Sequence, residues 1–305
     1  PNNLTFKATM AQVSVPASSA NIGPGFDCFG IALELRDRYA AQVLDDPTFD
    51  VDVTGEGADE VKKDAKNLVI RSMMRGFEHM GGKPRGIALR ALNVIPHGRG
   101  LGSSAAAIVG GLTLARSLVL TGEQYMSDED LITLATELEG HPDNVYAAFF
   151  GSLTSSFKHE YNFFYNTFPV SDKLVFNLLI PNTLGETETL RSELPDTVSM
   201  ENTVFHLSRM IHVPKAFEQG DIHSLRILLQ DKLHENVRYR FIPEYKKLLE
   251  YKKHLDEVMV ISGSGPSILL IGDLDLDVDY IEPLLTTFKI VEPTISQGVS
   301  WEVLK

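Results

Sequence analysis

The chain has 305 residues, of which 43% are hydrophobic and 23% are charged, and its formal net charge is −13. These values are ordinary for a globular protein of one or two domains. The negative charge argues against a general nucleic-acid binder and against a protein that lies on a membrane surface. A single cysteine, Cys28, excludes an internal disulfide and a cysteine metal cluster. It fits a cytoplasmic location, and we expect no membrane span or signal segment, because no long apolar run is present.

The hydrophobic pattern predicts a mixed order of elements, which is typical of an α+β protein. In the first half it predicts strands at 9–15, 31–44, 49–55 and 86–95. Helical spacing there predicts helices at 67–82, at 127–140 and at 143–151, and a long small-residue helix within 95–120. In the second half we expect strands at 173–182, 258–273 and 301–304, the middle one broken by a glycine turn. Helices are expected there around 200–219, 221–231, 243–256 and 279–288. The predicted boundary near residue 160 gives an N-terminal domain of residues 1–160 and a C-terminal domain of residues 161–305.

Three segments rich in Gly, Ser and Pro interrupt the strands: residues 16–30, residues 96–107 and residues 262–267. The middle one, PHGRGLGSSAAA, is the strongest chemical signal, and we call it the phosphate loop. Its glycines let the backbone come close to a phosphate, and the helix that follows presents unpaired N–H groups and a positive dipole end. It has neither the Walker pattern nor the dinucleotide pattern of glycines. From residue types alone, an ordinary turn before a packed helix remains the alternative.

Together the three segments resemble the conserved motifs of the GHMP kinases. The phosphate loop matches that family's P-x(3)-G-L-G-S-S-A pattern through Pro96, Gly100, Leu101, Gly102, Ser103, Ser104 and Ala105. The segments PASSANIGPGFDCFG, EGHPDNV, TETLRSELP and NVRYRFIP resemble homoserine kinases in particular, over about residues 11–270. The resemblance implies an N-terminal domain like the second domain of ribosomal protein S5 and a ferredoxin-like C-terminal domain. It also implies a kinase that uses ATP and Mg²⁺ to phosphorylate L-homoserine on the way to threonine, and a homodimer.

The resemblance also implies roles for individual residues. The nucleotide site comprises Asn67, Pro96, His97, Gly98, Arg99, Gly100, Leu101, Gly102, Ser103, Ser104, Ala105 and Ala106. Homoserine is a zwitterion, and we expect its binding residues to be Asn21, Asp27, His141, Asp143, Thr187, Arg191 and Arg238. Acids and amides suit the ammonium group, whereas the guanidiniums of Arg191 and Arg238 suit the carboxylate. Arg240 competes with Arg238 for this role. Without the resemblance, His141 reads as a structural histidine, Asn67 as a helix cap and each arginine as a surface residue.

The expected metal ligands are Ser104 and Glu137, with Glu139 as the rival because two carboxylates two positions apart point away from each other on a helix. Asn144 stands where mevalonate-type relatives have a catalytic Asp, and an amide cannot accept a proton at neutral pH. The resemblance therefore favours direct phosphoryl transfer in which Asn144, Arg191 and Glu137 take part in catalysis, while Asp143 is the alternative base. The other hypotheses are a GHMP kinase for another small alcohol and a non-catalytic ligand sensor. The intact Ser104 and Glu137 argue against the sensor.

Overall fold

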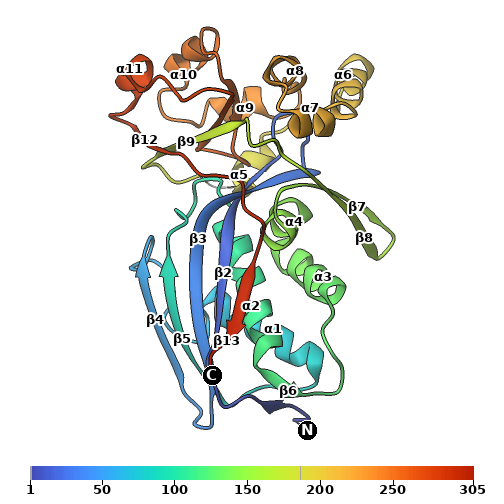
Figure 1. Ribbon diagram of the computed structural model, residues 1–305, viewed down its shortest axis with the longest axis vertical. Coiled ribbons are helices and arrows are strands. Elements are labelled where there is room, and N and C mark those ends of the chain that lie inside the picture. Colours follow the sequence, from blue (N-terminus) through green and yellow to red (C-terminus); the bar gives the residue numbers. More distant parts are fainter. Residues whose placement is uncertain (1, 186) are drawn as a thin grey trace.

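The computed structural model describes residues 2–185 and 187–305, and the side chains of residues 187–189 lie outside that description. Two sheets organise the fold (Figure 1). The larger sheet contains β2 (Ala11–Ala20), β3 (Phe29–Leu44), β4 (Phe49–Gly55), β5 (Gly86–Asn93), β7 (Leu153–His159), β8 (Asn162–Phe168) and β13 (Ser300–Val303). Its main path runs β13-β2-β3-β5-β4, and β7 pairs with the first residues of β3 and with β8. A small pair joins β1 (Thr5–Phe6) to β6 (Val119–Thr121).

Helices cover one face of the larger sheet (Figure 1). They are α1 (Leu68–Met80), α2 (Ser103–Leu118), α3 (Asp128–Glu139) and α4 (Pro142–Phe150). Helix α2 lies against β2 and β3, and the other three pack around it. Its buried face consists mainly of Ala, Gly, Leu, Ile and Val, so the helix can approach the sheet closely. This packing holds the first turn of α2 at the upper end of the sheet, next to the second half of the chain (Figure 1).

The smaller sheet contains β9 (Val175–Pro181), β10 (Val258–Ile261), β11 (Ile268–Gly272) and β12 (Phe288–Val291). All its pairs are antiparallel, and the strand order is β10-β11-β9-β12. The connection from β9 to β10 carries α5 (Thr187–Ser192), α6 (Met200–Met210), α7 (Val213–Gln219), α8 (Ile222–Leu228), α9 (Glu235–Tyr239) and α10 (Tyr245–Lys252). Helix α11 (Val278–Ile281) and a short 3₁₀ turn, Glu282–Leu284, lead from β11 to β12. The resulting β-α-β-β-α-β order matches the predicted ferredoxin-like arrangement.

The α+β prediction and most predicted elements are confirmed. The predicted 127–140 helix, α3, begins with a capping box, in which Ser127 and Asp130 bond each other's backbone. The prediction that all of residues 16–30 form a loop was wrong. Residues 16–20 belong to β2 and residues 29–30 belong to β3, so the first loop consists of residues 21–28. The predicted 279–288 helix is also too long, since helical structure ends at residue 284 and β12 begins at Phe288. The short helices α5 and α9 were not predicted.

The segment around residue 160, where we placed the domain boundary, is the turn of the β7–β8 hairpin. Strand β8 lies after that boundary and pairs with β7, and β13 pairs with β2, so both belong to the larger sheet. The division into residues 1–160 and 161–305 therefore stays a prediction. Strands β8 and β13 come after residue 160 in the chain but pair with strands that come before it. Figure 1 shows β13 running down beside β2 toward the C-terminus.

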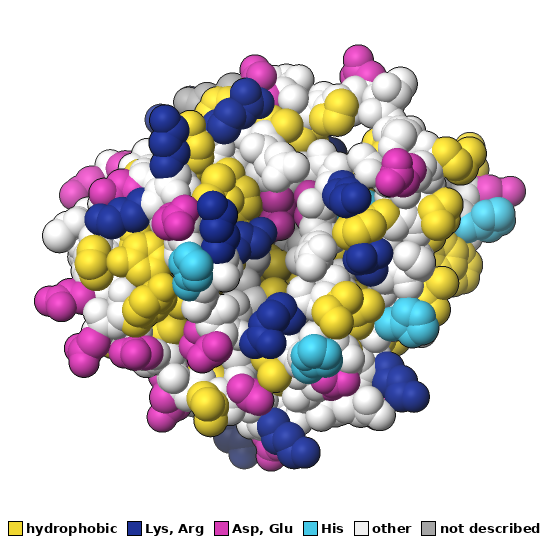
Figure 2. All heavy atoms as spheres, turned by 90° about the horizontal axis from the view of Figure 1, so that it is seen from above, with side chains coloured by type: hydrophobic (Ala, Val, Ile, Leu, Met, Phe, Trp, Pro, Cys, Tyr) yellow, Lys and Arg dark blue, Asp and Glu magenta, His cyan; other side chains and the backbone are white. Residues whose placement is uncertain are grey.

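Surface charge is unevenly distributed on this negative chain. Figure 2 views the molecule from the end formed by the second half, where Lys and Arg side chains gather around the middle of the face and most Asp and Glu side chains lie nearer its rim. A net negative protein can therefore still offer a local positive region to an anionic ligand. Within the described part of the chain, every helix is too short or too polar to cross a lipid bilayer.

Candidate active site

A cleft with a volume of about 250 Å³ lies where the first loop, the phosphate loop and the second half of the chain meet. The side chains and backbone that line it come from six separate segments. They are Ala20, Asn21, Asp27, Gly98, Gly100, Leu101, Gly102, Ser103, Ser104, Glu139, His141, Asp143, Asn144, Arg191, Arg238, Gly263 and Ser264. Most of the predicted nucleotide and substrate residues therefore line one cavity.

The phosphate loop ends at the first turn of α2, where Gly102 is the N-cap residue and has a left-handed backbone with φ of 71°. Gly100 also has positive φ, 74°, and a Cβ atom built on it would lie 2.2 Å from the carbonyl oxygen of Ser262. Only glycine fits this close backbone approach. The Ser262 hydroxyl donates a 2.7 Å hydrogen bond to the Gly100 carbonyl, so the turn of residues 262–267 packs against the phosphate loop.

Ser104, in the first turn of α2, donates its hydroxyl hydrogen to both carboxylate oxygens of Glu139, each 2.9 Å away. Burial and the charge of Asp143 raise the pKa of Glu139 to about 7, although the bond from Ser104 opposes this. Glu137 is exposed to solvent instead and does not line the cleft. The geometry therefore favours Glu139 over Glu137 as the carboxylate beside Ser104. Residues two apart on a helix lie about 200° apart around its axis, so only one of the two can face α2.

The first loop has a strained backbone: Asn21, Ile22 and Asp27 all have positive φ. The Asn21 amide nitrogen donates to the Gly263 carbonyl at 3.0 Å, and its oxygen accepts from the backbone N–H of Asp27 at 3.0 Å. Asn21 thereby joins the first loop to the 262–267 turn. Its amide nitrogen and oxygen each have a protein partner, and the residue also lines the cleft.

Asp27 and Arg191 form a bidentate ion pair across the cleft, with N–O distances of 2.8 and 3.0 Å. Burial opposes ionisation of Asp27, but the hydrogen bonds and charge of Arg191 outweigh it and hold the pKa of Asp27 below its ordinary value. Both side chains are about one third exposed, 33% and 36%. Two groups that were expected to bind opposite ends of one substrate thus neutralise each other in this structure.

Arg238 is 1% exposed, whereas Arg240 is exposed on the surface, so the geometry favours Arg238. Burial, and then the nearby charge of Arg191, lower the pKa of Arg238 to about 10. The Nε atoms of Arg191 and Arg238 are both buried without a hydrogen-bond partner among the described residues. Buried unpaired donors are costly, so each of these guanidiniums keeps a donor that the described residues do not satisfy.

The junction between α3 and α4 supplies His141, Asp143 and Asn144. Asp143 is 5% exposed, and burial raises its pKa to about 6, with Asp27 contributing in the same direction. The side-chain oxygen of Asn144 accepts a 2.8 Å hydrogen bond from the hydroxyl of Ser18. An amide whose oxygen is held this way presents its NH₂ group as a donor.

A second, smaller cavity of about 170 Å³ shares Ser103 and Ser104 with the cleft and extends toward α1. Asn67 and His97 line it. Asn67 is the N-cap of α1, and its side-chain oxygen accepts from the Val69 N–H at 2.9 Å. The predicted helix cap is thus confirmed, at a position that also faces the cavity beside the phosphate loop.

Four phosphate-loop residues line neither cavity: Pro96, Arg99, Ala105 and Ala106. Arg99 donates to the carbonyl oxygens of His97, Pro181 and Asn182, so it joins the loop to the end of β9. The Thr187 side chain lies outside the described residues. Sequence reasoning missed Ser18, Phe26 and His234, whose contacts cross long stretches of chain. The serine-rich run before Asn21 is a signal that could have identified Ser18.

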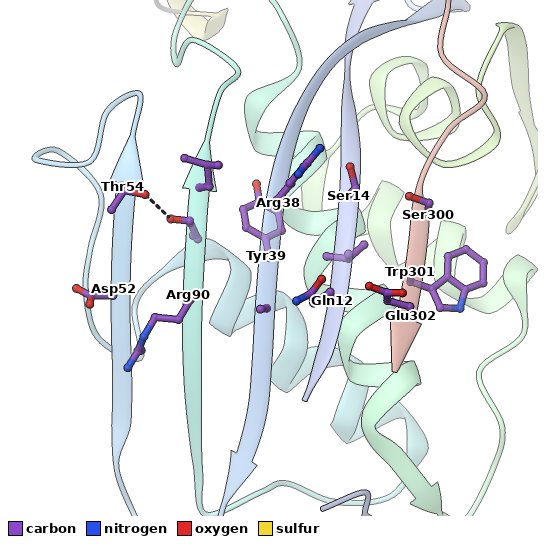
Figure 3. A pocket seen from close by; sticks show the side chains of 14 residues that line it. Gln12, Ser14, Arg38, Tyr39, Asp52, Thr54, Arg90, Ser300, Trp301 and Glu302 are labelled. Atoms are coloured by element: carbon purple, nitrogen blue, oxygen red, sulfur yellow. Dashed lines mark hydrogen bonds between the residues drawn. The ribbon is translucent and has the colours of Figure 1, made fainter. Parts of the chain in front are cut away.

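A larger cavity, about 750 Å³, lies elsewhere, on the open face of the larger sheet (Figure 3). Figure 3 shows polar side chains from β2, β3, β4, β5 and β13 lining it, among them Ser14, Arg38, Arg90 and Glu302. It contains none of the glycine-rich segments. The chemistry predicted from the sequence therefore belongs to the smaller cleft.

The chain is similar to known proteins of one family. A family model for the N-terminal domain of GHMP kinases matches residues 67–152. A homoserine kinase of Streptomyces coelicolor is 37% identical over 282 residues, which cover 92% of this chain and 90% of that protein. A homoserine kinase of Clostridium botulinum is 35% identical over 283 residues, with 92% and 93% coverage.

Solved structures show the same likeness. The crystal structure of a homoserine kinase from Cytophaga hutchinsonii superposes with a TM-score of 0.83 at 25% identity, over 99% of this chain and 100% of that one. A mevalonate diphosphate decarboxylase of Enterococcus faecalis superposes with a TM-score of 0.64 over 97% of this chain and 99% of that one. At 12% identity, the second likeness concerns the fold alone. The two-domain α+β architecture predicted from the sequence is confirmed.

Proposed function

The chain belongs to the homoserine kinase family of GHMP kinases, and from that membership we propose how its residues work. The reaction moves the γ-phosphoryl group of ATP to the side-chain hydroxyl of L-homoserine and gives O-phospho-L-homoserine, a step toward threonine. The observation that carries the assignment of residues is the position of the phosphate loop. The N-terminus of helix α2, which follows this loop, opens into the cleft that Arg191, Arg238, Asp143 and Glu139 also line.

ATP binds with its phosphates on the loop between Gly98 and Ser104. The backbone N–H groups at the start of α2 and the helix dipole attract these oxygens. The base extends into the adjoining cavity near Asn67 and His97, which shares Ser103 and Ser104 with the cleft. Pro96, Arg99, Ala105 and Ala106 shape the loop from behind without touching the nucleotide.

Ser104 and Glu139 are the proposed Mg²⁺ ligands. A hydroxyl and a carboxylate already within 2.9 Å of each other are the oxygen donors that Mg²⁺ prefers. The described residues contain no group of three or more His, Cys, Asp or Glu side chains placed to hold a metal, so phosphate oxygens and water complete the site. When bound, the ion neutralises charge on the β- and γ-phosphates.

The homoserine carboxylate binds Arg191 and Arg238, whose buried Nε donors lack partners in the described structure. The ammonium group binds near Asp27 and Asp143, with His141 and Thr187 in the surrounding shell. The Asp27–Arg191 pair separates to admit the zwitterion, so that Asp27 faces the substrate ammonium group and Arg191 faces the substrate carboxylate. Binding therefore replaces one ion pair with two.

Catalysis depends on positioning, since the γ-phosphoryl transition state is loose and needs little help from a base. Asn144 donates from its amide group to hold the substrate hydroxyl, Arg191 fixes the amino-acid end and Glu139 replaces Glu137 as the acidic residue beside the phosphates. Asp143 is the alternative base. The Asp143→Asn variant separates the two roles: a collapse of kcat with an unchanged KM for homoserine would identify a base, and a raised KM an ammonium ligand.

The proposal also includes a homodimer and a cytoplasmic location. Sedimentation of the purified protein tests the dimer. One assay tests the substrate: ADP release with homoserine, serine, threonine and mevalonate compared side by side. We expect homoserine to give the highest kcat/KM. Activity with mevalonate alone would overturn the assignment of the cleft.

A further inference from the structure

A buried histidine, His234, lies behind the substrate cleft at the N-terminal end of α9. Its Nε2 atom is 2.8 Å from the carbonyl oxygen of Gly23, and its Nδ1 atom is 2.8 Å from the Nη1 atom of Arg238. A guanidinium can only donate and a carbonyl oxygen can only accept. One neutral tautomer satisfies both contacts: Nδ1 accepts from Arg238, and Nε2–H donates to Gly23.

The His234 imidazole also contacts the first loop through the aromatic ring of Phe26. Phe26 stacks on His234, with ring centroids 5.2 Å apart and an interplanar angle of 29°. The guanidiniums of Arg238 and Arg191 lie over the Phe26 ring, each 5.4 Å from its centroid. His234 is therefore joined to the first loop at two points, and to the guanidinium of the cleft at a third.

The surroundings keep this imidazole neutral. Burial lowers the pKa of His234 to about 4, and the charge of Arg238 acts in the same direction, while Asp231, 3.6 Å away, opposes them. A proton on Nδ1 would place an N–H group against the N–H group of Arg238. The acceptor that holds the guanidinium is therefore present throughout the neutral range of pH.

We propose that His234 is a positioning residue that holds Arg238 in the cleft. The inference rests on the proposed function, in which Arg238 binds the homoserine carboxylate. A hydrogen bond to a charged group is stronger than one between neutral groups. Loss of the imidazole acceptor removes the shorter of the two hydrogen bonds that the Arg238 guanidinium makes among the described residues, and leaves the 3.4 Å contact with the Gly263 carbonyl.

Two matched substitutions separate the contacts of the imidazole. In His234→Asn the amide oxygen takes the place of Nδ1 and can still accept from Arg238. In His234→Gln the amide takes the place of Nε2, so the contact with Gly23 remains and the acceptor for Arg238 is lost. Each variant is assayed with L-homoserine and with 3-aminopropan-1-ol, which is homoserine without its carboxylate.

We expect His234→Gln to lower kcat/KM for homoserine by about 10- to 100-fold, mainly through KM, and to change kcat/KM for 3-aminopropan-1-ol by less than about threefold. His234→Asn should stay within about threefold of the wild type on both substrates. Equal losses on both substrates in His234→Gln, or equal damage by the two substitutions, would overturn the inference, because a merely structural histidine predicts them. Failure of the wild type to phosphorylate homoserine would instead remove the proposed function.

The wild-type protein offers an independent measurement if either variant fails to fold. Long-range ¹H–¹⁵N NMR spectra of the imidazole should show an unprotonated Nδ1 and a protonated Nε2 around neutral pH, in the presence of ATP analogue and homoserine. A protonated Nδ1 would contradict the assigned contact with Arg238.

Discussion

The carboxylate of Asp27 and the guanidinium of Arg191 face each other through two hydrogen bonds, 2.8 and 3.0 Å long, although the residues are 164 positions apart in the chain. Both side chains line the cleft. In the proposed function they bind opposite ends of the zwitterionic substrate, so the ion pair compensates both charges until the substrate replaces it.

Breaking this pair should raise the KM for homoserine. Asp27→Asn and Arg191→Met are each expected to increase it by about 10- to 100-fold with little change in the KM for ATP, because each removes a charge-assisted contact. The double variant should lose less than the product of the two effects, since the residues are coupled. Initial rates at varied homoserine concentration give the KM of the wild type, of each single variant and of the double variant. Strictly multiplicative losses would show that the residues act independently.

The two glutamates at the end of α3 give a sharp comparison. Glu139→Gln should lower kcat by at least about 100-fold and raise the Mg²⁺ concentration needed for half-maximal rate, because it removes the carboxylate beside Ser104. Glu137→Gln, on the exposed side, should stay within about twofold of the wild type. Magnesium titrations of both variants decide between the carboxylates, and the reverse result would restore Glu137.

Activity should rise with pH. Burial raises the pKa of Asp143 to about 6 and that of Glu139 to about 7, and a neutral carboxyl group attracts neither an ammonium group nor a cation. We expect kcat/KM for homoserine to increase from about pH 5 to about pH 8, because this ratio reports the ionisation of the free enzyme. Asp143→Asn should remove the lower inflection and keep the upper one. A flat profile over this range would contradict the placement of these acids.

The stability of the ligand-free protein, unlike its activity, should fall as the pH rises. A carboxyl whose pKa is higher in the folded state than in the unfolded state binds its proton more tightly when folded, so stability falls as pH rises between the two values. For Glu139 and the buried Glu235, whose pKa values burial raises to about 7, that interval runs from their ordinary value to about 7. Glu139→Gln should therefore stabilise the ligand-free protein at neutral pH by on the order of 1 kcal/mol. Urea unfolding at pH 5 and pH 8 checks this. No difference between variant and wild type at either pH would contradict it.

The close approach at Gly100 predicts a severe effect of a single methyl group. Gly100→Ala would place Cβ 2.2 Å from the Ser262 carbonyl at a backbone with positive φ, so we expect a loss of about 2 kcal/mol or more in stability and a higher KM for ATP. Gly140→Ala is the matched control, because its φ is also positive but no atom lies within 4 Å of the added Cβ. It should cost only about 1 kcal/mol. Thermal unfolding and ATP kinetics compare the two, and similar losses would assign the effect to backbone strain alone.

The glycine-rich segments could be recognised from the sequence because Gly and Pro interrupt alternating patterns in a way that local chemistry explains. The caps of α1 and α3 follow from the same local rules. Which glutamate faces Ser104 could not be predicted. The rotation of α3 about its own axis is set by packing against α2, and both residues satisfy the same local pattern.

Contacts between distant segments were also beyond local reasoning. The buried acceptor of Arg238 lies on its own helix at i−4, but its function depends on Gly23 and Phe26, far earlier in the chain. The β7–β8 hairpin was missed because its aromatic residues occur at adjacent positions, which weakens the alternation expected for a strand. Its exposed outer strand β8 has little core to bury, so tertiary pairing with β7 determines its conformation.

Strand β13 has a consequence for synthesis of the protein. Residues 300–303 pair with β2, so the edge of β2 stays open on the ribosome until these residues have been translated. An uncovered strand edge is a template for pairing with other chains. Messages truncated just before this strand are therefore expected to yield aggregates, even though every residue assigned to ATP and homoserine has already been made.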